Sequence, residues 1–110
     1  MNPLNSVETS VKNEAGRRPL MVEKQIKVLI VDDHSGVRAG IKNMLQMAKD
    51  MVVVGEGVNG AEAIELVAAK KPDILLLDIE LPDQRGDSVM RHIHTVQPSM
   101  KVLAVSSYSD

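Results

Sequence analysis

The sequence predicts an α/β fold in which helices cover both faces of a parallel β-sheet. Three observations carry this prediction: short, almost continuously apolar segments, longer segments with helical apolar spacing, and the regular alternation of the two kinds. Strands that are buried on both faces read as unbroken apolar runs, and parallel neighbours are joined by right-handed helical crossovers. The 110 residues suffice for one small domain.

The first strand and helix are expected where the regular pattern begins. The segment IKVLIV (26–31) is a β-branched apolar run that ends at an acidic pair. Ser35 is a candidate N-cap of the following helix, and Gly40 within that helix suggests close packing against the sheet. The apolar face of this helix would comprise Val37, Ile41, Met44, Leu45 and Ala48.

A second strand and helix follow directly. The segment MVVVGEG (51–57) is predicted to be the strand, and Asn59 with Glu62 three residues later resembles a capping box at the start of the helix. The helix should end before Pro72, after two lysines whose positive charges suit its negative end.

The third strand, the third helix and the fourth strand complete the pattern. The segment DILLLD (73–78) is predicted to be a strand, and a loop rich in turn residues follows it. Asp87 or Ser88 is expected to cap the third helix, which Pro98 ends. The segment KVLAVSS (101–107) is predicted to be the fourth strand.

Composition argues against several classes of function. The net charge of −2 gives no basic surface for nucleic acid, and the absence of cysteine excludes disulfides and thiolate metal sites. No apolar run approaches the roughly 18 residues that span a bilayer, and the N-terminus does not resemble a signal peptide. We therefore expect a cytoplasmic protein without a membrane partner.

The chain divides at about residue 25. Residues 1–24 have no periodic apolar stripe and are predicted to form a flexible leader, whereas residues 25–110 are predicted to form the domain. Met1 and Met21 are both candidate starts of the natural product.

Carboxylates end two of the predicted strands. Asp32 and Asp33 follow the first strand, and Asp78 ends the third. If the strand order is 2-1-3-4, these strands are neighbours about 4.8 Å apart, and ligands bind at this edge of such sheets. Three converging carboxylates require a cation or hydrogen-bond donors, and oxygen ligands suit Mg²⁺.

This arrangement favours chemistry on phosphorus. With Mg²⁺ present, one carboxylate can act as the nucleophile, as in enzymes that form an aspartyl phosphate. Ser106, at the end of the fourth strand, can donate its hydroxyl to a phosphoryl group. His34 follows the acidic pair and can tune it, although a solvated loop histidine is the more common outcome. The structural alternative is that the acids merely cap helices.

The motifs resemble those of response-regulator receiver domains. VLIVDDHSGVRAGIKNML is similar to the family's first strand, acidic pair and first helix, PDILLLDIELPDQRGDSVM to its phosphoacceptor strand and loop, and KVLAVSS to its fourth strand. The resemblance covers residues 26–110 and implies a flavodoxin-like fold with strand order 2-1-3-4. The Asp-Asp-His start followed by Val37-Arg38 is similar to the LuxR/NarL-type branch.

The resemblance also implies roles for individual residues. Asp78 would accept a phosphoryl group from a sensor histidine kinase, Asp33 would bind Mg²⁺ directly, and Asp32 would support the ion through water. The main-chain carbonyl of Glu80 would be a further metal ligand, and Ser106 would contact the phosphoryl group. The chain would be a signalling module rather than an enzyme, catalysing only its own phosphotransfer and dephosphorylation. DNA would be bound by an output domain and not by this chain.

Receiver domains continue beyond the fourth strand with a helix, a fifth strand carrying a lysine, and a last helix, and this sequence lacks them. We therefore expect a partial receiver domain over residues 25–110. The segment 101–107 would then be an unprotected edge strand, which favours a homodimer or a domain-swapped dimer.

Two other functions compete with this interpretation. Gly55-x-Gly57-x-x-Gly60 follows an apolar strand and resembles a dinucleotide-binding fingerprint, with Asp78 at the end of the next strand. Glutamates within and just after that motif would oppose a pyrophosphate. The other alternative is a Mg²⁺-dependent phosphohydrolase with Asp78 as nucleophile and Glu80 as its acidic partner.

Overall fold

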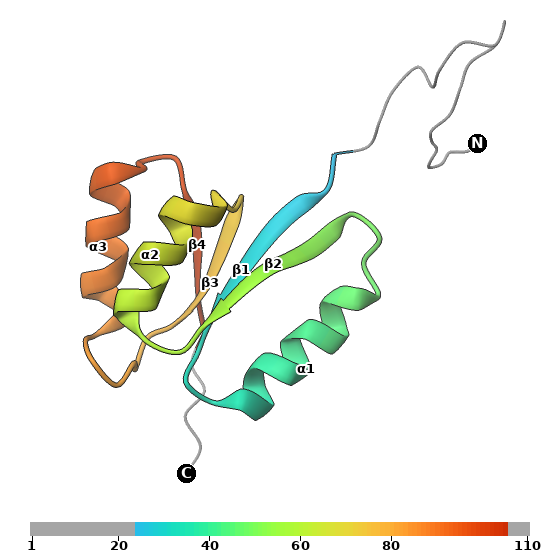
Figure 1. Ribbon diagram of the computed structural model, residues 1–110, viewed down its shortest axis with the longest axis horizontal. Coiled ribbons are helices and arrows are strands. Elements are labelled where there is room, and N and C mark those ends of the chain that lie inside the picture. The colour runs from blue at the N-terminus through green and yellow to red at the C-terminus, as the bar shows by residue number, and fades with distance from the viewer. Residues whose placement is uncertain (1–23, 106–110) are drawn as a thin grey trace, which may run out of the picture.

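The computed structural model describes residues 24–105, which form one four-stranded parallel sheet with three helices (Figure 1). The strand order is β2-β1-β3-β4, so the predicted α/β class and the order 2-1-3-4 are confirmed. The strands are β1 (Ile26–Val31), β2 (Met51–Gly57), β3 (Ile74–Asp78) and β4 (Lys101–Val105). The helices are α1 (Ser35–Gln46), α2 (Gly60–Lys70) and α3 (Gly86–Val96). The leader predicted over residues 1–24 lies almost wholly outside the described residues, as do Ser106 and Ser107.

The contiguous apolar cluster lies on one face of the sheet, and Val28 and Ile30 on the opposite face of β1 are buried as well. Alternate residues of a strand point to the same face, and on β1 and β3 those facing α2 and α3 are completely buried. Figure 1 shows these two helices side by side over that face. The core cluster consists of Leu29, Val31, Ala63, Val67, Leu75, Leu77, Val89, Ile93 and Met100.

The other face is covered by α1 near β2, on the side of the sheet opposite to α2 and α3 (Figure 1). Although the structure describes all of α1, none of its residues is buried. Four of the five residues of the predicted apolar face are half-buried, although one of them, Ala48, lies beyond the end of the helix, and Met44 is 70% exposed. The packing role predicted for Gly40 is also wrong, since no described atom other than the neighbouring main chain of α1 itself lies within 4 Å of where its Cβ would stand.

The predicted N-caps of α1 and α3 are wrong. His34, not Ser35, precedes the first turn of α1, and Arg85 rather than Asp87 or Ser88 precedes that of α3. Neither capping residue bonds a described main-chain N–H of its helix through its side chain. Asp87 lies inside the first turn instead, where Oδ1 of its carboxylate accepts a hydrogen bond from the N–H of Ser88 at 3.0 Å.

Asn59 is the N-cap of α2 as predicted, but the reciprocal hydrogen bond to Glu62 comes from the residue before the cap and not from the cap itself. The side chain of Asn59 accepts a hydrogen bond from the N–H of Glu62 at 2.8 Å, and Oε1 of Glu62 accepts one from the N–H of Val58 at 2.9 Å. The helix ends at Lys70, and Lys71 adopts a left-handed conformation with φ of 48° before Pro72. Its C-terminus is therefore where the sequence predicts it.

Strand β4 lies at the edge of the sheet and pairs with β3 alone among the described strands. Val102 packs against the core cluster, whereas Leu103 is 59% exposed. Within residues 24–105, no helix is long and apolar enough to cross a membrane.

Candidate metal site

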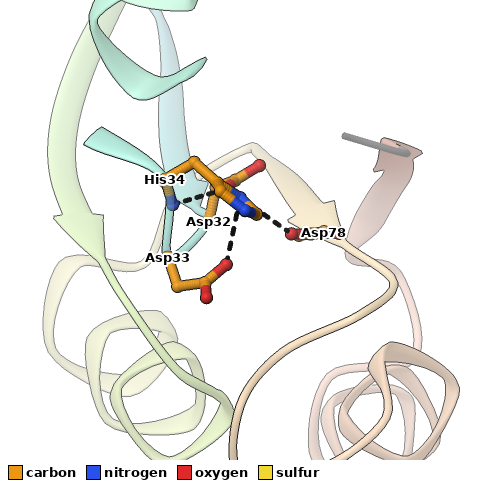
Figure 2. Close-up of side chains that lie close together, drawn as sticks. All are labelled: Asp32, Asp33, His34 and Asp78. Carbon is orange, nitrogen blue, oxygen red and sulfur yellow. Dashed lines mark hydrogen bonds and ion pairs between the residues drawn. The ribbon is translucent and has the colours of Figure 1, made fainter. Parts of the chain in front are cut away.

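The carboxyl ends of β1 and β3 bring four potential ligands together (Figure 2). Val31 pairs with Leu77 in the parallel register, so the residues that follow them, Asp32 and Asp78, emerge side by side. Asp33 and His34 continue from β1, and one ligand atom of each of the four residues lies within 4.8 Å of all the others. The sheet thus brings together the three aspartates that the sequence singled out.

Two of the three carboxylates are buried. Asp32 is 2% exposed and Asp78 is 1% exposed, whereas the side chain of Asp33 is 35% exposed. Oδ1 of Asp32 accepts hydrogen bonds from the N–H and from the ring Nδ1 of His34, both at 2.8 Å. Oδ2 of Asp32 has no hydrogen-bond partner within residues 24–105, a costly state for a buried carboxylate oxygen.

The ring of His34 contacts more than one carboxylate. Its Nδ1 lies 3.1 Å from Oδ1 of Asp33 and 3.9 Å from Oδ2 of Asp78. The hydrogen bond to Asp32, and then the negative charge of Asp33, raise the pKa of His34 above its ordinary value. Although 54% of its side chain is exposed, His34 does not behave as a merely solvated loop histidine.

A polar network on the α1 side holds the main chain of Asp32. Nη1 of Arg38 donates a hydrogen bond to the carbonyl oxygen of Asp32 at 2.6 Å, and Nε of Arg38 donates one to Glu56 at 3.0 Å. Nζ of Lys42 lies 2.8 Å from the second carboxylate oxygen of Glu56. The hydrogen bond from Lys42, reinforced by Arg38, lowers the pKa of Glu56. These two cations therefore neutralise Glu56 and are not bonded to the carboxylates of the acidic cluster.

The loop after β3 folds back against the end of that strand. Oδ1 of Asp78 accepts a hydrogen bond from the N–H of Glu80 at 3.0 Å, and the N–H of Gly86 donates to the carbonyl of Ile79 at 2.9 Å. A Cβ at Gly86 would lie 2.6 Å from Cα of Ile79 and 2.8 Å from the carbonyl oxygen of Asp78. A residue without a side chain is therefore required at this position. Glu80 forms an isolated antiparallel β-bridge with Arg85, which brings the two ends of this loop together.

The side chain of Asp83, in that loop, lies against the N-terminus of α2. Its carboxylate accepts hydrogen bonds from the N–H groups of Gly60 at 2.7 Å and Ala61 at 3.0 Å. The bond from Gly60 is the main reason why the pKa of Asp83 lies below its ordinary value. A Cβ at Gly60 would also lie within 2.6 Å of the side chain of Gln84. The helix N-terminus that a dinucleotide would need thus already binds a carboxylate of the chain itself, that of Asp83.

Gly55 and Gly57 serve packing rather than ligand approach. A Cβ at either would come within 3.2 Å of a neighbouring leucine side chain, Leu29 or Leu66 respectively. Together with the carboxylate at the start of α2, this packing accounts for the glycine motif without a nucleotide.

The donor set fits a divalent cation. Carboxylate oxygens predominate, two of the carboxylates are buried, and a buried oxygen of Asp32 lacks a donor among the described residues. Glu80 is exposed and is the second residue after β3, and Ser106 lies outside the described residues. The side chain of Arg85 is 79% exposed and pairs with Asp87 at 3.1 Å.

Sequence reasoning missed the contacts that cross between elements. Arg38 and Glu56 are separated by 18 residues, and Asp83 lies 23 residues from Gly60. No local spacing announces such pairs. For Asp83, its place in a Pro-Asp turn in the loop after β3 was the available signal.

A parallel sheet with this strand order and an acidic site at its switch point defines the class of flavodoxin-like α/β proteins. Within that class, the chain belongs to the response regulator receiver domain family, whose sequence profile matches residues 28–110. Neither the dinucleotide-binding nor the phosphohydrolase alternative is supported.

The chain is similar to longer curated regulators. It is 38% identical over 88 residues to the transcriptional regulatory protein DegU of Brevibacillus brevis, covering 80% of this chain and 37% of DegU. It is 42% identical over 83 residues to the response regulator VraR of Staphylococcus saprophyticus, covering 76% of this chain and 40% of VraR. The chain thus spans about two fifths of the length of these curated relatives.

Solved structures of response regulators have the same fold as this chain. The receiver domain of the response regulator NarL from Mycobacterium tuberculosis superposes with a TM-score of 0.72 at 32% identity, over 79% of this chain and 70% of that one. A LuxR-family response regulator from Aurantimonas superposes with a TM-score of 0.73 at 28% identity, over 78% of this chain and 61% of that one.

Proposed function

We propose that Asp78 is the phosphoacceptor of this receiver domain and takes its phosphoryl group from a sensor histidine kinase. The observation that carries the proposal is the position of Asp78, buried at the end of β3 and within a few ångströms of the ligand atoms of Asp32 and Asp33. A carboxylate oxygen of Asp78 would attack phosphorus of the donor phosphohistidine. The phosphorus–oxygen bond forms as the phosphorus–nitrogen bond breaks, and the electron pair returns to the imidazole of the donor.

The acidic cluster supports Mg²⁺ as the cofactor. We propose that Asp33 and Asp78 bind the ion directly, that Asp32 supports it through water, and that the carbonyl of Glu80 completes the protein ligands. When bound, Mg²⁺ supplies positive charge that offsets the negative charge on the transferred phosphoryl oxygens. The hydroxyl of Ser106 remains the predicted contact to the phosphoryl group.

The partners follow from the family rather than from this chain alone. Names of relatives such as "transcriptional regulatory protein" support an output domain that binds DNA in longer relatives, while this chain acts as a signalling module and not as a metabolic enzyme. Phosphotransfer is expected in the cytoplasm, because kinases draw their phosphoryl group from ATP there.

We also infer self-association. Within residues 24–105, β4 has one pairing partner, and Leu103 is 59% exposed beside that open edge. A homodimer or a domain-swapped dimer would cover both features. Sedimentation should show a concentration-dependent dimer that Leu103→Lys weakens, and a monomer at every concentration would contradict the inference.

The phosphoacceptor is tested by intact mass after incubation with acetyl phosphate and Mg²⁺. A single phosphoryl adduct is expected on the unmodified chain, and chelation of Mg²⁺ should abolish it. Asp78→Asn should remove the adduct, whereas Asp87→Asn, a matched change in the half-exposed first turn of α3, should retain it. An adduct that survives Asp78→Asn, or its absence from the folded unmodified chain, would overturn the proposal.

A further inference from the structure

One nitrogen atom faces all three carboxylates of the site. Nδ1 of His34 lies 2.8 Å from Asp32, 3.1 Å from Asp33 and 3.9 Å from Asp78 (Figure 2). The main-chain N–H of His34 donates to the same oxygen of Asp32, which holds the residue beside that carboxylate. The imidazole therefore lies between the groups that a cation would bind.

These separations suit ligands of a single metal ion. Ligand atoms about 2.0–2.2 Å from a metal are separated from one another by about 2.8–3.6 Å, and the contacts of Nδ1 with Asp32 and Asp33 fall within that range. A second observation is independent of the ring. Oδ2 of Asp32, a residue only 2% exposed, has no hydrogen-bond partner among the described residues. The cluster thus has both a nitrogen donor in position and an unsatisfied buried oxygen.

We propose that His34 is a metal ligand that gives this acidic site a mixed nitrogen–oxygen donor set, selecting borderline divalent ions such as Zn²⁺ or Co²⁺ over Mg²⁺. Imidazole suits the first-row transition metals, whereas carboxylate, carbonyl and water suit Mg²⁺. The inference rests on the proposed function in one respect, namely that the acidic cluster binds a metal at all.

The same residue works against Mg²⁺. That ion takes oxygen ligands and keeps several waters, so the imidazole offers it no favourable bond. To admit Mg²⁺ with its waters, the ring must give up its contacts with Asp32 and Asp33. Removing the ring should therefore leave the affinity for Mg²⁺ unchanged or raise it, while it weakens the binding of a transition ion.

The test measures two metals on three proteins at one fixed pH. Co²⁺ alone, followed by its visible absorption, and Mg²⁺ alone, followed by calorimetry, are titrated into the unmodified chain, His34→Ala and His92→Ala. His92 is an exposed histidine on α3 that lies outside the acidic cluster, so its removal deletes an imidazole without touching the site.

His34→Ala should weaken Co²⁺ binding by about tenfold or more and should not weaken Mg²⁺ binding, while His92→Ala changes neither. Proton NMR of the Co²⁺-loaded unmodified chain should show strongly shifted imidazole resonances that are absent from His34→Ala. The resonances of the unmodified chain report imidazole ligation directly, whether or not the variant folds.

Three results would overturn the inference: Co²⁺ affinity unchanged in His34→Ala, an equal loss of both metals, or the absence of shifted imidazole resonances. Its failure is distinguishable from that of the proposed function. If Asp78 takes up no phosphoryl group but Co²⁺ binds through His34, only the phosphoacceptor proposal fails. If the phosphoryl adduct forms with Mg²⁺ but His34 makes no difference to Co²⁺, only the present inference fails.

Discussion

On one face of the sheet, α2 and α3 press completely buried side chains against β1 and β3, whereas on the other face α1 contributes no buried residue (Figure 1). The first face contains the contiguous apolar cluster that includes Leu75 and Ile93. On the second face α1 is attached through half-buried side chains and through the polar bonds of Arg38 and Lys42.

The two faces therefore contribute differently: one holds the contiguous apolar cluster, and the other borders the candidate metal site. Apolar burial is the main source of folding free energy. The contiguous cluster lies on the α2/α3 face, whereas the buried apolar side chains on the α1 face, Val28 and Ile30, belong to β1 and not to α1. The α1 face holds the main chain of Asp32 through Arg38 and presents His34 at the start of α1. A region held by few buried contacts can adjust its position at low cost, which suits a face that borders a ligand site.

Substitutions at two leucines on opposite faces of the sheet test this difference most directly. Leu75 is 0% exposed and Leu103 is 59% exposed. Leu75→Ala should cost about 2–5 kcal/mol of unfolding free energy because it leaves a cavity in a closed core, and Leu103→Ala about 0.5 kcal/mol or less. Urea unfolding followed by circular dichroism measures both, on protein dilute enough to be monomeric so that no second copy covers Leu103. Equal losses would show that the two faces contribute alike.

Two glycine-to-alanine substitutions test how closely the main chain is packed at the loop after β3 and in α1. Gly86→Ala places a methyl group against Cα of Ile79 and should destabilise the fold by about 1–3 kcal/mol. Gly40→Ala adds a methyl group where no described atom other than the neighbouring main chain of α1 lies within 4 Å. It should stabilise the fold by about 0.5–1 kcal/mol, because alanine is the better helix former. Thermal unfolding of both variants gives the two signs, and a destabilising Gly40→Ala would mean that α1 is packed more tightly than its exposure indicates.

Strands and site were predictable to the extent that local pattern determines them. A continuous apolar run marks a strand buried on both faces, and an acid that ends such a run must emerge at the edge of a parallel sheet. Asp32 and Asp78 could therefore be brought together from the sequence. The N-cap at Asn59 was predictable for the same reason, since the N–H that it caps lies three residues away.

What escaped prediction depends on side chains that reach across the fold. Periodicity identifies the apolar side of α1, but it does not say whether another element covers that side, so Met44 is exposed where burial was expected. The contact of His34 with three carboxylates depends on a rotamer, and that of Asp83 with α2 depends on how a loop folds back. Neither follows from spacing along the chain.

The N-termini of α1 and α2 also differ, because only α2 has a side-chain N-cap among the described residues. The side chain of Asn59 satisfies an N–H group of α2, while Ser35 lies inside the first turn of α1 and caps nothing. Asn59→Ala should cost about 1 kcal/mol, within the usual range for a lost N-cap, and Ser35→Ala close to zero. Denaturant midpoints of the two variants, compared at equal slope, test this. A loss at Ser35 as large as that at Asn59 would mean that the hydroxyl caps α1 in solution.

The smallest effect expected concerns acid and salt. The hydrogen bond from Lys42, followed by that from Arg38, lowers the pKa of Glu56 in the folded chain. This carboxylate therefore stabilises the fold above its unfolded pKa, and the contribution is lost as pH falls through the lower, folded value. Because Glu56 is partly exposed, the pair contributes about 1 kcal/mol or less and is screened by salt.

Lowering the pH through the folded pKa of Glu56 should therefore increase local opening of α1 before it increases that of α2. Hydrogen-exchange protection factors, corrected for the intrinsic rate at each pH, should fall for the amides of α1 while those of α2 persist. High salt at neutral pH should produce a weaker version of the same change, and Glu56→Gln should reduce the sensitivity of α1 to both. Parallel loss of protection in α1 and α2 would mean that the two faces open together, and that the polar network on the α1 side adds no local stability of its own.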